Sequence, residues 1–186
     1  MKVKIGVSNR HVHLCSEDYN ILFGNTQMEN IKDLVQPGEF ASNLTVEIAT
    51  NKSRLTKVRV LGPLRSYTQV EISKTDCFTL GIVAPVRSSG DLTGAGEVTI
   101  IGPCGTVIKS CVIIANRHLH INPKTRSSLG LDNVEKIKVR VGEEKGAILD
   151  NVYVKETSVG ELELHLDTDD ANSTLIKTGD MAELIY

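Results

Sequence analysis

Short alternating segments separated by turn residues constrain the fold of this 186-residue chain most strongly. Apolar and polar residues alternate within most of these segments, as in a β-strand with one buried face. Dipeptides such as Gly62-Pro63 and Gly102-Pro103 mark turns. A turn about every ten residues favours β-barrels or β-sandwiches over βαβ units. The expected strands are residues 3–7, 44–48, 56–61, 69–72, 78–84, 97–101, 105–114, 136–141, 147–154, 161–166 and 181–185.

Three short helices are expected between these strands. Ser16 is a good N-cap, acidic residues follow it in the first turn, and Gly24 ends this helix. Asn122-Pro123 begins a second helix that runs to residue 129. Residues 169–175 form the third. The chain is therefore expected to be mainly β.

Composition excludes several classes of function. The net charge is −2, the basic residues are scattered, and aromatic residues make up 4% of the chain with no tryptophan. No nucleic-acid partner is expected, because neither a basic surface nor a set of stacking side chains is present. The N-terminus enters strand-like sequence at once, without an apolar leader or a long apolar run. This predicts a cytoplasmic protein that has no membrane partner.

The histidines carry the clearest functional signal. Four of the five lie in two copies of one phrase, Asn9-Arg10-His11-Val12-His13 and Asn116-Arg117-His118-Leu119-His120. Residues i and i+2 of a strand point to the same face, so each phrase offers two neighbouring imidazoles. For one such pair, chance exposure is a sufficient explanation, but two copies favour metal ligation. A helix cap follows each phrase, so both an internal duplication and convergence remain open.

Each histidine pair needs a third ligand, because zinc takes three or four protein donors in its usual sites. His165, in an alternating segment with Glu161 and Glu163, is the candidate for the second pair. For the first pair the candidate is an acid, Glu71, or a thiol such as Cys15, two residues after His13. The remaining cysteines lack C-x-x-C spacing and are expected in the core.

A cation for an anionic substrate is also predicted near the first pair. Arg65 follows the Gly62-Pro63 turn, so its guanidinium is expected to reach back over the site. The planar guanidinium matches phosphate or carboxylate in a bidentate manner.

Five segments in the same order closely resemble the PduL-type phosphotransacylases, the phosphate propanoyltransferase family. They are SNRHVHL at 8–14, GPLR at 62–65 with QVE at 69–71, APVR at 84–87 with SGD at 89–91, NRHLH at 116–120, and LDTDDAN at 166–172. The resemblance implies two β-barrels capped by short α-helices, with the metal site at the interface between them. Residues 1–9 and 116–186 would form the first barrel, and residues 10–115 the second.

The same resemblance implies the chemistry. His11, His13 and Glu71 would hold one zinc ion, whose fourth position takes the sulfur of coenzyme A. His118, His120 and His165 would hold a second, completed by water or phosphate. Arg65 would contact phosphate in catalysis, and Arg87 is either a second phosphate contact or a surface cation. The implied enzyme is a phosphate propanoyltransferase that converts propanoyl-CoA or acetyl-CoA and phosphate to acyl phosphate and coenzyme A.

Two other functions fit the same ligands. A two-zinc hydrolase would attack a thioester or ester with a metal-bound hydroxide, and a metal-binding scaffold would have no turnover. The resemblance also implies a homodimer. It leaves open whether the enzyme serves propanediol degradation, with association with a bacterial microcompartment, or general acetate metabolism. Microcompartment members often carry an N-terminal targeting extension, and His11 lies too close to Met1 to leave room for one.

Overall fold

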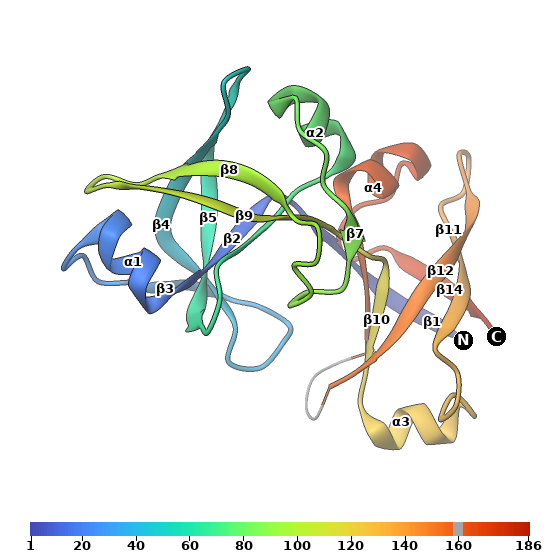
Figure 1. The fold of residues 1–186 in the computed structure, drawn as a ribbon. Helices are drawn as coiled ribbons and strands as arrows, with labels where there is room; N and C mark the ends of the chain where they lie inside the picture. The colour runs from blue at the N-terminus through green and yellow to red at the C-terminus, as the bar shows by residue number, and fades with distance from the viewer. Residues whose placement is uncertain (158–161) are drawn as a thin grey trace. The chain divides into compact units, whose positions relative to one another are not determined.

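The computed structural model describes residues 1–157 and 162–186, and it is mainly β (Figure 1). Its strands are β1 (Lys2–Ser8), β2 (His11–Cys15), β3 (Asn30–Asp33), β4 (Phe40–Ala49), β5 (Arg54–Arg65), β6 (Gln69–Glu71), β7 (Val86–Arg87), β8 (Gly96–Ile101), β9 (Thr106–Ala115), β10 (His118–Ile121), β11 (Lys136–Val141), β12 (Ala147–Glu156), β13 (Glu163–Asp167) and β14 (Met181–Ile185). Its helices are α1 (Ser16–Phe23), α2 (Lys74–Leu80), α3 (Pro123–Ser128) and α4 (Thr168–Thr174). Among the described residues, no helix has the length and apolar composition needed to span a bilayer.

The chain divides into two compact units. The first unit contains residues 1–9, 35–37 and 116–186, and the second contains residues 10–34 and 38–115. In the first unit, the strands close into a barrel in the order β1-β13-β10-β12-β11-β14. In the second, β4-β5-β2-β6-β9-β8 form a ring, because β8 pairs with both β4 and β9. Two barrels with short helices are thus confirmed, while the domain boundaries stay a prediction.

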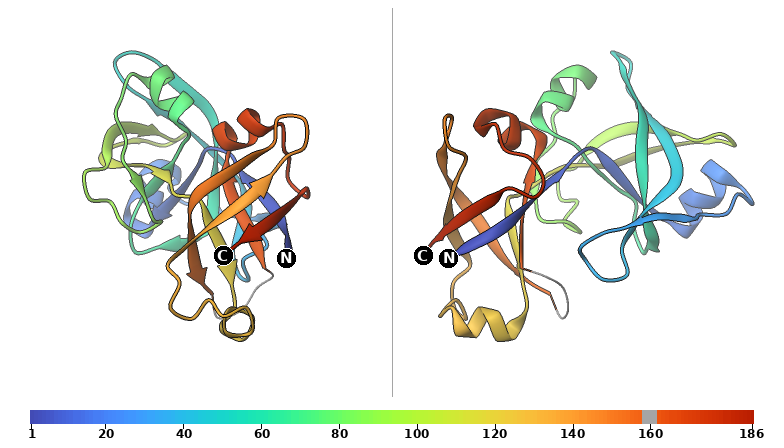
Figure 2. Two further views of the ribbon diagram at one scale, coloured as in Figure 1. Left: turned by 90° about the vertical axis from the view of Figure 1, so that its right-hand side faces the viewer. Right: turned by 180° about the vertical axis from the view of Figure 1, so that it is seen from behind.

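Both ends of the chain lie in the first barrel. The N-terminal strand β1 pairs antiparallel with the C-terminal strand β14, so the two termini lie side by side (Figure 2). On its other side, β1 pairs parallel with β13.

The two barrels share one pairing order. If β1, β13, β10, β12, β11 and β14 are matched to β9, β6, β2, β5, β4 and β8, every neighbour and every strand direction agrees. The strand before each histidine phrase is exchanged: β1 precedes β2 but pairs with β13, whereas β9 precedes β10 but pairs with β6. The similarity between the two halves of the chain therefore extends beyond the short histidine phrases to the order and direction of all six strands of each barrel, which favours an internal duplication.

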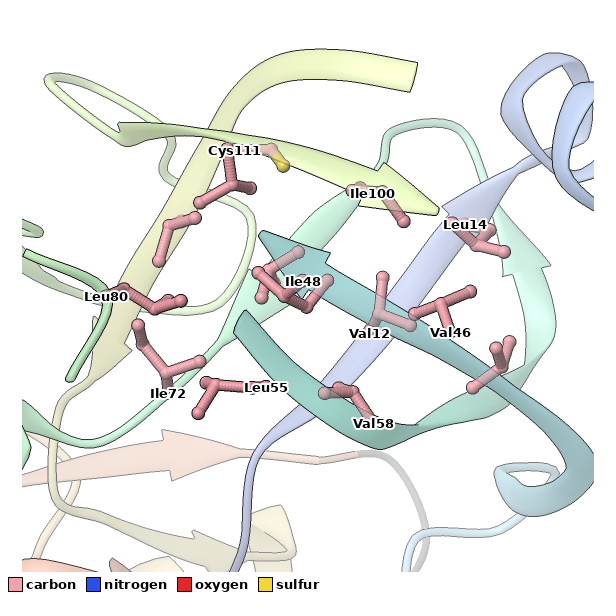
Figure 3. Close-up of a cluster of buried hydrophobic side chains, with 14 of the residues drawn as sticks. Val12, Leu14, Val46, Ile48, Leu55, Val58, Ile72, Leu80, Ile100 and Cys111 are labelled. Carbon is pink, nitrogen blue, oxygen red and sulfur yellow. The ribbon is translucent and has the colours of Figure 1, made fainter. Parts of the chain in front are cut away.

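The core of the second unit explains which way the first histidine pair points. Val12 and Leu14 of β2 are fully buried and point into the barrel together with Val46, Ile48 and other apolar residues (Figure 3). Because successive side chains of a strand alternate, His11 and His13 lie on the opposite face of β2.

The core of the first unit orients the second set in the same way. Leu119 and Ile121 of β10 and Leu164 and Leu166 of β13 are core residues. The histidines of both strands therefore lie on the faces that point away from the barrel core.

The expectation of a strand at residues 78–84 is wrong, because residues 78–80 belong to α2 and residues 81–84 form a turn and an irregular segment. Its N-cap is Ser73, whose hydroxyl accepts a hydrogen bond from the Asp76 amide, while the Asp76 carboxylate accepts one from the Ser73 amide. This capping box fixes the first turn, and Gly81 ends the helix in a left-handed conformation with φ of 70°. The expected start of another strand, at Glu161, lies outside the described residues.

Candidate metal centre

Three imidazoles converge on the first unit's barrel. His118 and His120 lie on β10, and His165 lies opposite His118 on the antiparallel neighbour β13. One ring nitrogen of each lies within 4.8 Å of the other two. The ring centroids are 4.6–5.1 Å apart. The structure therefore brings together the three residues proposed as one ligand set, although their role as ligands stays a prediction.

The chemistry of His120 fits a metal ion. Its Nδ1 is buried and has no hydrogen-bond partner among the described residues. Leaving such an atom unpaired costs about 1–3 kcal/mol, which a bound metal would offset. Burial, and the neighbouring His118 and His165, lower the pKa of His120 to about 2. The ring is therefore neutral near pH 7 and keeps the lone pair that a metal requires.

Replacing His120 by leucine is expected to stabilise the metal-free protein by about 1 kcal/mol, because the unpaired buried nitrogen is removed. The folded-state pKa of His120 lies below its ordinary value of 6.5, so the unfolded chain binds the extra proton as the pH falls below 6.5. The wild type should therefore lose more stability than the variant over that range. Urea unfolding of both metal-free proteins at pH 7.5 and pH 5 measures this difference. A variant that is less stable at both pH values would contradict the assignment.

A second donor group lies on the second unit's barrel. His11 and His13 of β2 and Glu71 of β6 place their donor atoms within 4.8 Å of one another. His11 is paired opposite Glu71, and its Nε2 lies 3.5 Å from Glu71 Oε2. The side chains of these two residues are only 10% and 11% exposed. Two imidazoles and one carboxylate form a usual zinc-binding combination.

A chain of hydrogen bonds joins Arg65 to this donor group. Arg65 Nη1 donates to Ser89 Oγ at 3.1 Å, and the Gln69 amide donates to the same oxygen at 2.8 Å. The Gln69 amide also lies 2.6 Å from Glu71 Oε1. Sequence reasoning missed Gln69 and Ser89. The i, i+2 relation of Gln69 to Glu71 was a usable signal, and Ser89 lies in the family segment SGD at 89–91, but neither residue was assigned a role in the site.

Arg65 also contacts a carboxylate and a phenol hydroxyl. Its Nη2 lies 2.8 Å from Glu39 Oε1, and its Nη1 lies 3.3 Å from the Tyr67 hydroxyl. The Arg65 side chain is 21% exposed. One guanidinium nitrogen thus binds a carboxylate oxygen, an acceptor similar to a phosphate oxygen.

Arg87 and Cys15, which the sequence also suggested, contact residues outside the two donor groups. Arg87 donates to the Thr93 carbonyl at 3.1 Å and lies 3.5 Å from an Asp91 oxygen, so its guanidinium is engaged by the following loop. The Cys15 sulfur lies 3.4 Å from the Thr68 hydroxyl and is not part of either donor group.

The arginine of each histidine phrase forms a bidentate ion pair with a helix. Arg10 reaches Asp76 of α2 at 3.1 and 2.7 Å, and Arg117 reaches Asp170 of α4 at 2.8 and 2.7 Å. Each aspartate lies in the first turn of the helix that follows the strand of the third donor. The Asp170 carboxylate raises the pKa of Arg117. Each pair thus ties the strand of the histidine pair to the strand of its third donor.

Comparison with known proteins places the chain in a family. The family model described as phosphate propanoyltransferase matches residues 4–177. The chain belongs to the phosphate propanoyltransferase family. A phosphate propanoyltransferase of Thermotoga maritima is 45% identical over 184 residues, covering 97% of this chain and 88% of the relative. Those of Rhodopseudomonas palustris (43%; 98% and 82% covered) and Citrobacter freundii (45%; 92% and 82% covered) are similarly close.

Membership in the phosphate propanoyltransferase family confirms the resemblance seen in the motifs and the expectation of an acyltransferase. The two donor groups differ in composition, with three imidazoles in one and two imidazoles and a carboxylate in the other. Three protein donors leave a position on zinc for a substrate atom or water, as in catalytic rather than structural sites.

Proposed function

We propose that the protein transfers an acyl group reversibly between coenzyme A and phosphate. Propanoyl-CoA or acetyl-CoA and phosphate would give the acyl phosphate and coenzyme A. Family membership supports a phosphate acyltransferase. The observation that carries the proposal to particular residues is the hydrogen-bonded chain from Arg65 to Glu71, because it links an oxyanion-binding cation to a metal donor group.

The proposal assigns each donor group to one zinc ion. His118, His120 and His165 would hold one, and His11, His13 and Glu71 would hold the other. When bound, the two ions would polarise a phosphate oxygen and stabilise the thiolate that leaves the thioester. We propose zinc because it commonly binds both donor sets, which are three imidazoles in one group and two imidazoles with a carboxylate in the other.

Arg65 has the role of binding and orienting phosphate. Its fork of donors would take two phosphate oxygens in place of the Glu39 carboxylate. A phosphate oxygen then attacks the thioester carbonyl carbon, the carbon–sulfur bond breaks, and coenzyme A leaves as the thiolate. Holding the nucleophile in position supplies much of the rate enhancement in such reactions. No side chain is acylated, so Cys15 has no covalent role.

The deciding experiment measures coenzyme A release from acetyl-, propanoyl- and butanoyl-CoA, with and without phosphate. Release is expected only with phosphate, with one acyl phosphate formed per thiol. A chelator should abolish it, and zinc should restore it. Equal release without phosphate would identify the hydrolase instead, and no turnover with two bound zinc ions would favour the scaffold.

The oligomeric state and the association with a microcompartment rest on the family resemblance. We propose a cytoplasmic homodimer, with association with a microcompartment as the alternative setting. Light scattering during size-exclusion chromatography measures the mass of the particle against the 20.3 kDa of one chain.

A further inference from the structure

The two barrels carry a polar side chain at the same position beside the third donor. Gln69 lies opposite His13 in the β2–β6 pair, and Glu163 lies opposite His120 in the β10–β13 pair. Each precedes the third donor by two residues and therefore shares its face of the strand. The matched strand order of the barrels makes the two positions equivalent.

Both side chains hydrogen-bond the third donor of their own strand. The Gln69 amide donates to Glu71 Oε1 at 2.6 Å. Glu163 Oε2 lies 2.6 Å from His165 Nε2. Where the third donor is a carboxylate, its neighbour is an amide that can donate. Where the third donor is an imidazole, its neighbour is a carboxylate that can accept. In each barrel, the hydrogen-bonding role of the neighbouring side chain therefore matches the chemistry of the third metal donor.

The structure also provides space for the Glu163 carboxylate. Gly6 of β1 pairs with His165, and a Cβ at Gly6 would lie 3.0 Å from the Glu163 carboxyl carbon and 3.1 Å from each oxygen. At the equivalent position of the other barrel, the residue opposite Glu71 is Ile113. A glycine is therefore found in the barrel where a carboxylate must lie against the strand.

Of the two described side chains that hydrogen-bond His165 Nε2, one can accept its proton. The Gln36 amide nitrogen also lies 3.2 Å from this ring nitrogen, but an amide NH2 group donates and does not accept. Glu163, which is 6% exposed and buried beside the ring, is the acceptor. A neutral imidazole that donates from Nε2 keeps its lone pair on Nδ1.

We propose that Glu163 and Gln69 are matched positioning residues for the two metal centres. Glu163 fixes the tautomer and orientation of His165, so that Nδ1 is the nitrogen left to bind a metal. Gln69 holds Oε1 of Glu71 and so orients the Glu71 carboxylate toward its donor group. This inference deepens the proposed function and rests on its two metal sites. Such outer contacts typically change metal affinity by about 10–100-fold.

The test compares Glu163→Gln with the wild type in zinc affinity, measured by competition with a chromogenic chelator. Glu163→Gln is expected to bind one of two zinc ions about 10–100-fold more weakly, with the other unchanged. Gly6→Ala should weaken the same ion, because its Cβ displaces the carboxylate without altering Glu163 itself. The matched control is Glu183→Gln, the same substitution at an exposed carboxylate of the same barrel, and should bind both ions as the wild type does.

The second arm uses Gln69→Leu, which should weaken the zinc ion that Glu163→Gln leaves unchanged. Absorption of the cobalt-loaded proteins reports the geometry of each site, and circular dichroism shows whether each variant is folded. Wild-type affinity for both ions in folded Glu163→Gln would overturn the proposal. Complete loss of one ion, as expected for a missing ligand, would also overturn it, because Glu163 would then bind metal directly.

The affinities are measured without substrate, so this inference and the proposed function can fail separately. If zinc affinity shifts as expected but coenzyme A release is independent of phosphate, the acyl transfer is wrong and the positioning role stands. If coenzyme A release depends on phosphate and both Glu163→Gln and Gln69→Leu keep wild-type zinc affinity, only the positioning role is wrong.

Discussion

Replacing His165 by alanine is expected to remove one zinc equivalent and to lower phosphate-dependent coenzyme A release by about 10³-fold or more. The physical reason is that two imidazoles remain where a catalytic zinc site uses three protein ligands. His118→Ala should lose the same ion, because His118 lies opposite His165 and their donor atoms lie within 4.8 Å. Elemental analysis gives the metal content, and thiol release gives the rate.

His11→Ala serves as the matched comparison for these variants. His11 belongs to the matching histidine phrase in the other barrel, so His11→Ala should lose the other zinc ion. Wild-type turnover by metal-free His118→Ala and His165→Ala would rule out the metal-dependent mechanism. Loss of both ions from every variant would show that the two sites do not bind independently.

Replacing Arg65 by alanine is expected to lower the phosphate-dependent rate by about 10²-fold while both zinc ions remain bound. In the proposed role Arg65 would supply two donors to one phosphate, so Arg65→Lys should recover only part of the rate because lysine lacks the planar fork. The phosphate saturation curve of thiol release measures the effect, and elemental analysis confirms that the metals are retained.

Arg54→Ala is the control for Arg65→Ala. Arg54 lies at the other end of the same strand, is 64% exposed, and pairs with Glu47 at the surface. Its removal should leave the phosphate dependence unchanged, since exposed ion pairs contribute little. If Arg65→Ala likewise keeps the wild-type phosphate dependence, Arg65 is not part of the phosphate site.

The alternation of side chains made the donor groups predictable from the sequence. His11 and His13 share a face because Val12 between them belongs to the core. His165 was identified by the same argument from the leucines on either side of it. These are local relations, and a strand of period two preserves them in any sheet.

Two parts of the structure were less accessible. The apolar residues at 78–84 fitted a strand, but the capping box of Ser73 and Asp76 determines a helix, and this signal was overlooked. The contacts of Ser89 and Gln36 depend on loops that are distant in the sequence from their partners. The exchange of β1 and β9 depends on pairings between distant strands, which local patterns do not specify.

The exchanged first strand has a consequence for folding during synthesis. The pairing strands of the second barrel all lie between residues 10 and 115, so this barrel can close as soon as that stretch has left the ribosome. The strand β1 is made before the second barrel but must wait for β13 and β14, which end at Asp167 and Ile185. Until then its edges are unpaired, and such edges invite aggregation. A strand translated before the whole second barrel thus finds its partners only after that barrel is complete.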